Sequence, residues 1–195
     1  MMIDNLKMRK APGWDKVTNA HIKFGGANLQ KCIILLSNAI NKLEYIPNNF
    51  KLGLIVPIPK GQKNRLHQDN HRGISLLPVF SKIYEKVLYN RTLAWARKNN
   101  LLHHLQGAER EKCSSLNTAW LIKEAITSNL ENGKSVYVGM LDKRKAYDSL
   151  WLKGNFYKLY TLGMKGRAWR KLPQPYSDFK CKVCFAGRCS EPLEP

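Results

Sequence analysis

One apolar stretch near the end of the chain constrains its fold more than any other feature. Residues 135–141 read Ser-Val-Tyr-Val-Gly-Met-Leu and end directly at Asp142. The apolar, β-branched and aromatic character of this stretch predicts a strand over residues 135–141. An aspartate at the end of a strand is more often a helix cap or a turn residue than a metal ligand. From these residues alone, Asp142 is either a capping side chain or a metal-binding carboxylate at the mouth of the strand.

The rest of the sequence mixes helical and strand patterns, which predicts an α+β fold. Apolar residues at helical spacing predict four helices, over residues 29–43, 78–98, about 114–132 and 151–162. A short strand is expected at residues 52–58, and a hairpin that turns at Gly187 is expected in residues 179–193. Residues 1–28 and the polar stretch 60–73 are predicted to be loops.

The charge balance limits the partners of the chain. The 195 residues contain 33 Lys and Arg against 14 Asp and Glu, a net charge of +19, and 44% of them are hydrophobic. Such a charge favours polyanions, with nucleic acid first and an acidic membrane surface second. A basic protein with no such partner is the alternative. The longest apolar run, residues 32–36, is too short to span a membrane, and the N-terminus lacks the apolar core of a signal peptide. We therefore expect an intracellular chain without a membrane partner; nuclear residence has no clear signal.

Five cysteines, an odd number without an export signal, predict free thiols in a reducing compartment. Cys181, Cys184 and Cys189 are spaced like part of a zinc knuckle. A structural zinc site uses four ligands, and no fourth ligand follows at a suitable distance. The hairpin interpretation of this stretch is therefore preferred over metal binding.

The neighbours of Asp142 carry a family resemblance. Residues 136–151, VYVGMLDKRKAYDSLW, resemble the first catalytic block of reverse transcriptases, especially those of non-LTR (LINE-type) retrotransposons. Further stretches resemble other blocks of that family, namely KAPGWD (10–15), LIVPIPKG (54–61), RGISLLP (72–78) with SKIYEKVL (81–88), and QGAER (106–110). The blocks follow one another in the order of the family and extend over nearly the whole chain.

The resemblance implies a right-hand polymerase fold, with fingers and a partial palm. It divides the chain into an N-terminal loop (1–28), finger helices and a strand (29–134) and an incomplete palm (135–195). Intact relatives are RNA-directed DNA polymerases that copy RNA into DNA with Mg²⁺ and dNTPs. The implied partners are therefore an RNA template, the RNA/DNA hybrid and a dNTP.

The resemblance also implies roles for individual residues. Asp142 would be the first catalytic aspartate and a Mg²⁺ ligand, with the carbonyl of Lys143 beside the same metal. Tyr147 would lie under the sugar of the nucleotide; its alternative is a buried core aromatic. Lys60 and Arg72 would reach the triphosphate, since lysine offers a point charge and arginine a planar fork of donors. Their alternative is a pair of solvated loop charges.

The sequence also departs from the family. The family continues with a hairpin that bears an Asp-Asp pair, and no Asp-Asp dipeptide occurs in these 195 residues. Polymerase chemistry needs carboxylates that hold two metal ions about 3.5–4 Å apart. We therefore expect a fragment that is inactive alone, unless a second polypeptide supplies the missing palm. The alternative function is a non-catalytic basic remnant that binds RNA or DNA.

Overall fold

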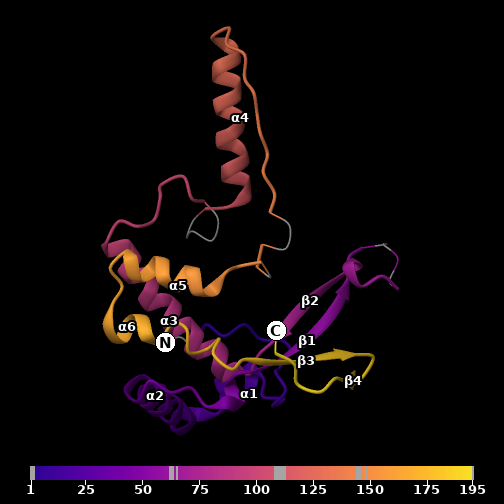
Figure 1. Cartoon of the computed structure of the whole chain (residues 1–195), viewed down its shortest axis with the longest axis vertical. Helices are drawn as coiled ribbons and strands as arrows, with labels where there is room; N and C mark the ends of the chain where they lie inside the picture. Colours follow the sequence, from indigo (N-terminus) through magenta and orange to yellow (C-terminus); the bar gives the residue numbers. More distant parts are fainter. Residues whose placement is uncertain are drawn as a thin grey trace. The chain divides into compact units, whose positions relative to one another are not determined.

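The chain forms two compact units, which are described separately. The computed structural model in Figure 1 describes residues 3–61, 64, 66–107, 113–143, 146–147 and 149–194. The first unit combines residues 1–90 with residues 152–195, and the second comprises residues 91–151. Helices and strands are both present, so the α+β prediction is confirmed at the level of fold class.

The first unit contains more helix than strand. The predicted helices at 29–43, 78–98 and 151–162 correspond to α2 (Gly26–Leu43), α3 (Val79–Lys98) and α5 (Leu152–Thr161). The unit also contains α1 (Asn19–Phe24), α6 (Gly166–Arg170) and the 3₁₀ turns η1 (Asn48–Phe50) and η2 (Gln68–Asn70). None of the helices in the described residues is both long enough and apolar enough to cross a membrane.

A small sheet lies beside these helices. Its strands are β1 (Leu52–Pro59), β2 (His71–Leu76), β3 (Lys180–Phe185) and β4 (Arg188–Cys189), in the spatial order β2-β1-β3-β4. Figure 1 shows β1 between β2, with which it is antiparallel, and β3, with which it is parallel. β1 is therefore the strand that joins the two ends of the chain into one unit.

The prolines of β1 explain where its pairing with β3 ends. The N–H of Lys60, just after β1, donates to the Asn70 carbonyl at 2.7 Å, on the β2 side. The backbone N–H groups of successive residues in a strand point to opposite sides, so those of the odd-numbered residues of β1 point toward β3. Pro57 and Pro59 occupy odd positions and have no N–H to donate. The β1–β3 ladder accordingly ends at Ile55, and the hairpin continues beyond it with β2 alone.

The apolar core of the first unit lies between α2 and α3. Each of two buried clusters takes side chains from both helices, and the residues are Ile3, Ile22, Ile33, Val79 and Ile83 in one and Ile40, Ile46, Tyr84 and Leu88 in the other. The phenyl rings of Phe50 and Phe80 stack with centroids 4.6 Å apart at the edge of the second cluster. The apolar periodicity that predicts these helices thus also identifies their buried faces.

Two of the predicted loops contain regular structure. Within residues 1–28, α1 begins after Thr18, whose hydroxyl accepts the His21 N–H at 3.4 Å while the Thr18 N–H donates to His21 Nδ1 at 3.2 Å. This reciprocal cap satisfies two N–H groups at the helix start. The stretch 60–73 includes η2 and the first residues of β2. The loop prediction is wrong at these places. The polar residues of both stretches gave no apolar pattern, whereas α1 is stabilised by its Thr18 cap and β2 by its pairing with β1.

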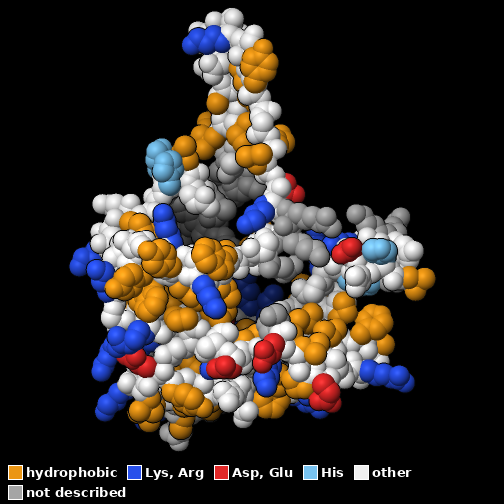
Figure 2. Space-filling view, in the orientation of Figure 1, with side chains coloured by type: hydrophobic (Ala, Val, Ile, Leu, Met, Phe, Trp, Pro, Cys, Tyr) orange, Lys and Arg blue, Asp and Glu red, His pale blue; other side chains and the backbone are white. Residues whose placement is uncertain are grey.

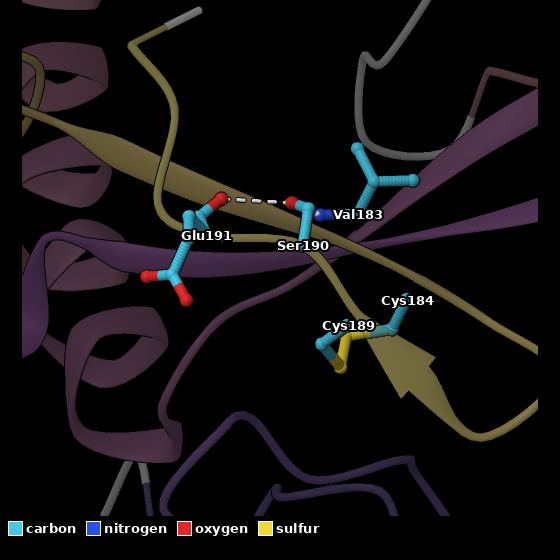
Figure 3. The surroundings of a disulfide bond; sticks show 5 residues. All are labelled: Val183, Cys184, Cys189, Ser190 and Glu191. Atoms are coloured by element: carbon cyan, nitrogen blue, oxygen red, sulfur yellow. Dashed lines mark hydrogen bonds between the residues drawn. A yellow bond between two sulfur atoms is a disulfide. The ribbon is translucent and has the colours of Figure 1, made fainter.

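The predicted hairpin near the end of the chain is confirmed. The prediction of free thiols holds for Cys32, Cys113 and Cys181 and is wrong for Cys184 and Cys189. The turn between β3 and β4 has Ala186 at φ 49° and Gly187 at φ 79°, the left-handed pair that defines a type I′ turn. Cys184 and Cys189 are cross-strand partners with Cα atoms 4.1 Å apart, and they form a disulfide (Figure 3). The antiparallel register brings these two thiols together, which their sequence spacing did not reveal.

The second unit contains the end of α3 (residues 91–98), the long helix α4 (Ser115–Glu131) and an extended segment. The Ser114 hydroxyl caps α4 by accepting the Asn117 N–H at 3.2 Å, as the sequence predicts. Residues 134–143 have no strand structure, so the predicted strand over 135–141 is wrong. A strand needs a partner for its N–H and carbonyl groups, and the described residues provide none for this segment.

Candidate functional site

The β1–β2 hairpin places two of the predicted phosphate-binding residues on one face. Arg72 lies opposite Ile58 in the ladder, so their side chains share a face of the hairpin. Lys60 is two residues beyond Ile58 and therefore projects to that same face. Lys60 and Arg72 are thus diagonal neighbours, a spacing of about 7–8 Å that long side chains can bridge.

A hydrogen bond within the β1–β2 hairpin holds the Lys60 side chain in place. Lys60 Nζ donates to the Asp69 carbonyl at 2.7 Å, across the loop that joins β1 to β2. The Arg72 side chain is exposed on β2. His71 opposes Pro59 and so faces the other side of the hairpin, where its Nδ1 lies 3.2 Å from the His67 carbonyl. The hairpin therefore presents one held ammonium group and one exposed guanidinium group to the same side.

The KAPGWD stretch is a loop, as predicted, but it packs against the start of α3, which the sequence did not indicate. A Cβ on Gly13 would lie 2.5 Å from Pro78 N and 2.6 Å from Leu77 C, so only glycine permits this approach. The Trp14 indole N–H donates to the Asn49 carbonyl at 3.0 Å. Lys82 Nζ, on α3, lies 3.5 Å from the Ala11 carbonyl. The KAPGWD stretch therefore packs against the segment that connects β2 to α3.

The predicted residues around Asp142 lie in the second unit. Asp142 and Lys143 are exposed at the end of the extended segment, and Tyr147 is 86% exposed. The alternative of Tyr147 as a buried core aromatic is therefore wrong. Asp148 lies outside the described residues. The metal and nucleotide roles of Asp142, Lys143 and Tyr147 remain predictions.

Asp142 has the donor chemistry that Mg²⁺ prefers, because carboxylate oxygens are hard ligands. Within the part of the chain that the structure describes, no three His, Cys, Asp or Glu side chains gather where they could share a metal ion. One carboxylate does not hold a two-metal site. The described residues alone therefore do not fit a complete Mg²⁺ site.

Burial shifts the pKa of two ionisable groups on α3. Burial raises the pKa of Glu85, and the nearby Lys82 partly opposes this shift. Burial also lowers the pKa of Lys82, against the attraction of Asp15 and Glu85. These shifts indicate a partly desolvated pair beside the KAPGWD stretch, and they affect stability more than chemistry.

No model of a protein family matches the sequence, but proteins of mobile elements do. The chain is 29% identical, over 86% of its length, to the probable RNA-directed DNA polymerase from transposon X-element of Drosophila melanogaster. It is 26% identical over 82% of its length to the corresponding protein of transposon BS, and 27% identical over 83% to that of mobile element jockey, both from the same fly. The chain spans 17% to 18% of the length of these relatives.

These relatives share one class of enzyme, RNA-directed DNA polymerase, and one genetic context, mobile elements. The chain is related to the reverse transcriptases of non-LTR retrotransposons. The resemblance read from the ordered sequence blocks is thereby confirmed.

Proposed function

We propose that the chain is the portion of an RNA-directed DNA polymerase that forms the fingers and begins the palm. The observation that carries the proposal is the similarity to polymerases of mobile elements over 82% to 86% of the chain. The α+β fold is compatible with such a role, and the net charge of +19 suits a template and a hybrid that are both polyanions.

In this proposal the β1–β2 hairpin binds the triphosphate of the incoming dNTP. Lys60 and Arg72 share one face of the hairpin, so both can contact one anionic group without rearranging the backbone. Arginine would bind phosphate oxygens through its fork of N–H donors and lysine as a point charge. The Lys60 ammonium would exchange the Asp69 carbonyl for phosphate oxygen.

Asp142 would contribute one carboxylate to a Mg²⁺ site that further polypeptide completes. The metal ions would activate the attacking hydroxyl and stabilise the leaving phosphate when bound. Lys143 would place its carbonyl beside that site, and Tyr147 would lie against the sugar of the nucleotide. All three residues are solvent-accessible in the second unit, as this requires.

Nucleotide binding tests the hairpin role directly. We expect Arg72→Ala to weaken dNTP binding by about tenfold or more, because a charged hydrogen bond contributes roughly 1.5–3 kcal/mol. Lys60→Ala should also weaken binding. Arg188→Ala on β4 is the matched control, since it removes an exposed strand arginine from a different hairpin. Equal dNTP affinities for Arg72→Ala and Arg188→Ala would contradict the proposed role.

Primer extension tests the role of Asp142. The 195-residue polypeptide should extend no primer on an RNA template above the level of its Asp142→Asn variant. A longer polypeptide that adds the Asp-Asp hairpin of the family should extend it, and Asp142→Asn should abolish that extension. Extension by the longer polypeptide that survives Asp142→Asn would refute the metal-ligand role.

The second candidate is nucleic-acid binding without catalysis, which the charge of the chain favours by itself. Both candidates predict RNA binding that weakens steeply with salt, because lysine and arginine displace counterions from phosphates. They differ in dNTP binding at the hairpin, which the non-catalytic candidate does not require.

A further inference from the structure

The outer face of α5 combines exposed tyrosines with lysines. Lys153, Tyr157 and Tyr160 are spaced i, i+4 and i+7 and therefore lie on one side of the helix. Tyr157 is 67% exposed and Tyr160 is 42% exposed. Lys165, between α5 and α6, places its Nζ 5.6 Å from the centre of the Tyr160 ring. We call Lys153, Tyr157, Tyr160 and Lys165 the α5 tyrosine face.

Contacts on its inner side hold this face in place. The Trp169 indole N–H, on α6, donates to the Phe156 carbonyl on α5 at 2.7 Å. The Trp169 ring also meets the Tyr160 ring edge-on, with centroids 5.3 Å apart. Arg170 then anchors α6 to Glu44 at the end of α2, through Nε at 2.9 Å and Nη2 at 3.0 Å. The tyrosine face is thus built on two helices that are tied to each other and to the first unit.

All of the charged side chains in the segment that carries this face are basic. Residues 149–177 contain no Asp or Glu, and their six basic residues are Lys153, Lys158, Lys165, Arg167, Arg170 and Lys171. Figure 2 shows hydrophobic side chains interspersed with Lys and Arg over the region of α5 and α6. The carboxylate of Glu44 pairs with Arg167 and Arg170, which are not part of the α5 tyrosine face. Charge complementarity therefore selects a polyanion for this surface.

We propose that the α5 tyrosine face binds single-stranded nucleic acid, with a base stacked on Tyr157 and phosphates contacted by Lys153 and Lys165. Aromatic rings interleaved with cations are the chemistry that single strands need, since bases stack and phosphates pair with charge. Residues three apart on a helix have Cβ atoms about 5–6 Å apart, so the face accommodates one or two nucleotides. A duplex hides the flat faces of its bases and cannot stack in this way. The inference rests on the proposed function for the identity of the polymer and adds a place where it binds.

The test uses the full 195-residue chain, a 12-nucleotide single-stranded oligouridine with a fluorescent label, and a buffer that contains EDTA. Fluorescence anisotropy should show Tyr157→Ala weakening binding by about 5- to 150-fold, the range expected for loss of one stacked base. Tyr157→Phe should keep most of the affinity, because phenylalanine also stacks. Lys153→Gln should lower the slope of log affinity against log salt by about 0.7, the value for one phosphate contact on a single strand.

Tyr89→Ala is the matched control. Tyr89 is exposed (42%, against 67% for Tyr157) and has Lys86 Nζ 4.2 Å from the centre of its ring, much as Tyr160 has Lys165, but it lies on α3 outside the α5 tyrosine face. We expect this variant to bind the oligonucleotide like the unmodified chain. An oligonucleotide that carries 5-iodouracil should crosslink to Tyr157 under ultraviolet light, as mass spectrometry of the digested chain would show.

Three outcomes would overturn this proposal and leave the proposed function intact. Equal affinities for Tyr157→Ala and Tyr89→Ala would exclude stacking on this face. An equal loss of single-strand and duplex binding on Tyr157→Ala would show that Tyr157 does not act by stacking on an exposed base. Tyr157-dependent binding to phosphatidylserine vesicles, without an effect on the oligonucleotide, would assign the face to a membrane. If the chain bound neither RNA nor DNA, the proposed function would fail with it, whereas binding that ignores Tyr157 overturns this inference alone.

Discussion

Gly13 provides the sharpest test of how the N-terminal block packs. The substitution Gly13→Ala adds one methyl group that would lie 2.5 Å from Pro78 N, 2.6 Å from Leu77 C and 2.8 Å from Leu77 O. All three atoms belong to the backbone, and the Pro78 side chain is fully buried, so no flexible side chain can move aside. Overpacking typically costs about 1–3 kcal/mol, and a backbone clash places this site near the upper end.

The unfolded state partly offsets this cost. Alanine restricts the unfolded chain more than glycine does and stabilises the native state by about 0.4–1 kcal/mol where its conformation is allowed. The expected net loss in the free energy of unfolding is therefore about 2 kcal/mol. With a urea dependence of about 2 kcal/mol per M, the midpoint of unfolding should fall by about 1 M.

Urea unfolding followed by circular dichroism measures this shift. Gly139→Ala is the control, because no atom lies within 4 Å of its added methyl group, and it should stay within about 0.5 kcal/mol of the unmodified chain. If Gly13→Ala behaved like Gly139→Ala, the close packing of the KAPGWD stretch on the start of α3 would be refuted.

Three further substitutions test local features of the first unit. Ala186→Asn should raise the melting temperature, because asparagine tolerates the left-handed turn better than alanine does; a lower melting temperature would contradict the type I′ turn. Burial raises the pKa of Glu85 above 4.5, so the native state gains stability as the pH falls through the raised pKa. Glu85→Gln should therefore raise the urea midpoint at pH 7 and leave it unchanged at pH 4, and no gain at pH 7 would argue against its burial. The hydrogen bond from Arg170 lowers the pKa of Glu44 below 4.5, so its stabilisation is present above pH 4.5 and is lost as the pH falls through the lowered pKa. Glu44→Gln should lower the urea midpoint at pH 7 but not at pH 2, and an equal loss at both values would exclude the ion pair as the cause.

Local patterns predicted the helices well and the strands unevenly. The apolar periodicity of α2 and α3 and the serine cap of α4 act within a few residues, so the sequence contains nearly all of the information. The segment 135–141 has good strand composition but lacks strand structure, because strand pairing depends on a distant partner. The polar start of β2 forms a strand because β1 lies beside it.

The candidate site likewise has features that the sequence predicted and features that only the structure shows. The ordered blocks identified Lys60, Arg72, Asp142, Lys143 and Tyr147 as candidates from sequence alone, and the relatives confirmed the family. The shared face of Lys60 and Arg72 follows only from the ladder register. The exposure of Tyr147 was likewise not readable from its residue type.

The sequence by itself determined the family resemblance, the basic character and the four longest helices of this protein, because motifs, charge and helical periodicity are properties of neighbouring residues. The tertiary structure decided which distant groups meet. It placed Gly13 on the backbone at Pro78, paired Cys184 with Cys189, and tied α5 and α6 together beneath Tyr157 and Tyr160. The Gly13 contact joins segments far apart in the chain, and the other two depend on strand register and on how two neighbouring helices pack, so the periodicity of the sequence encodes none of them.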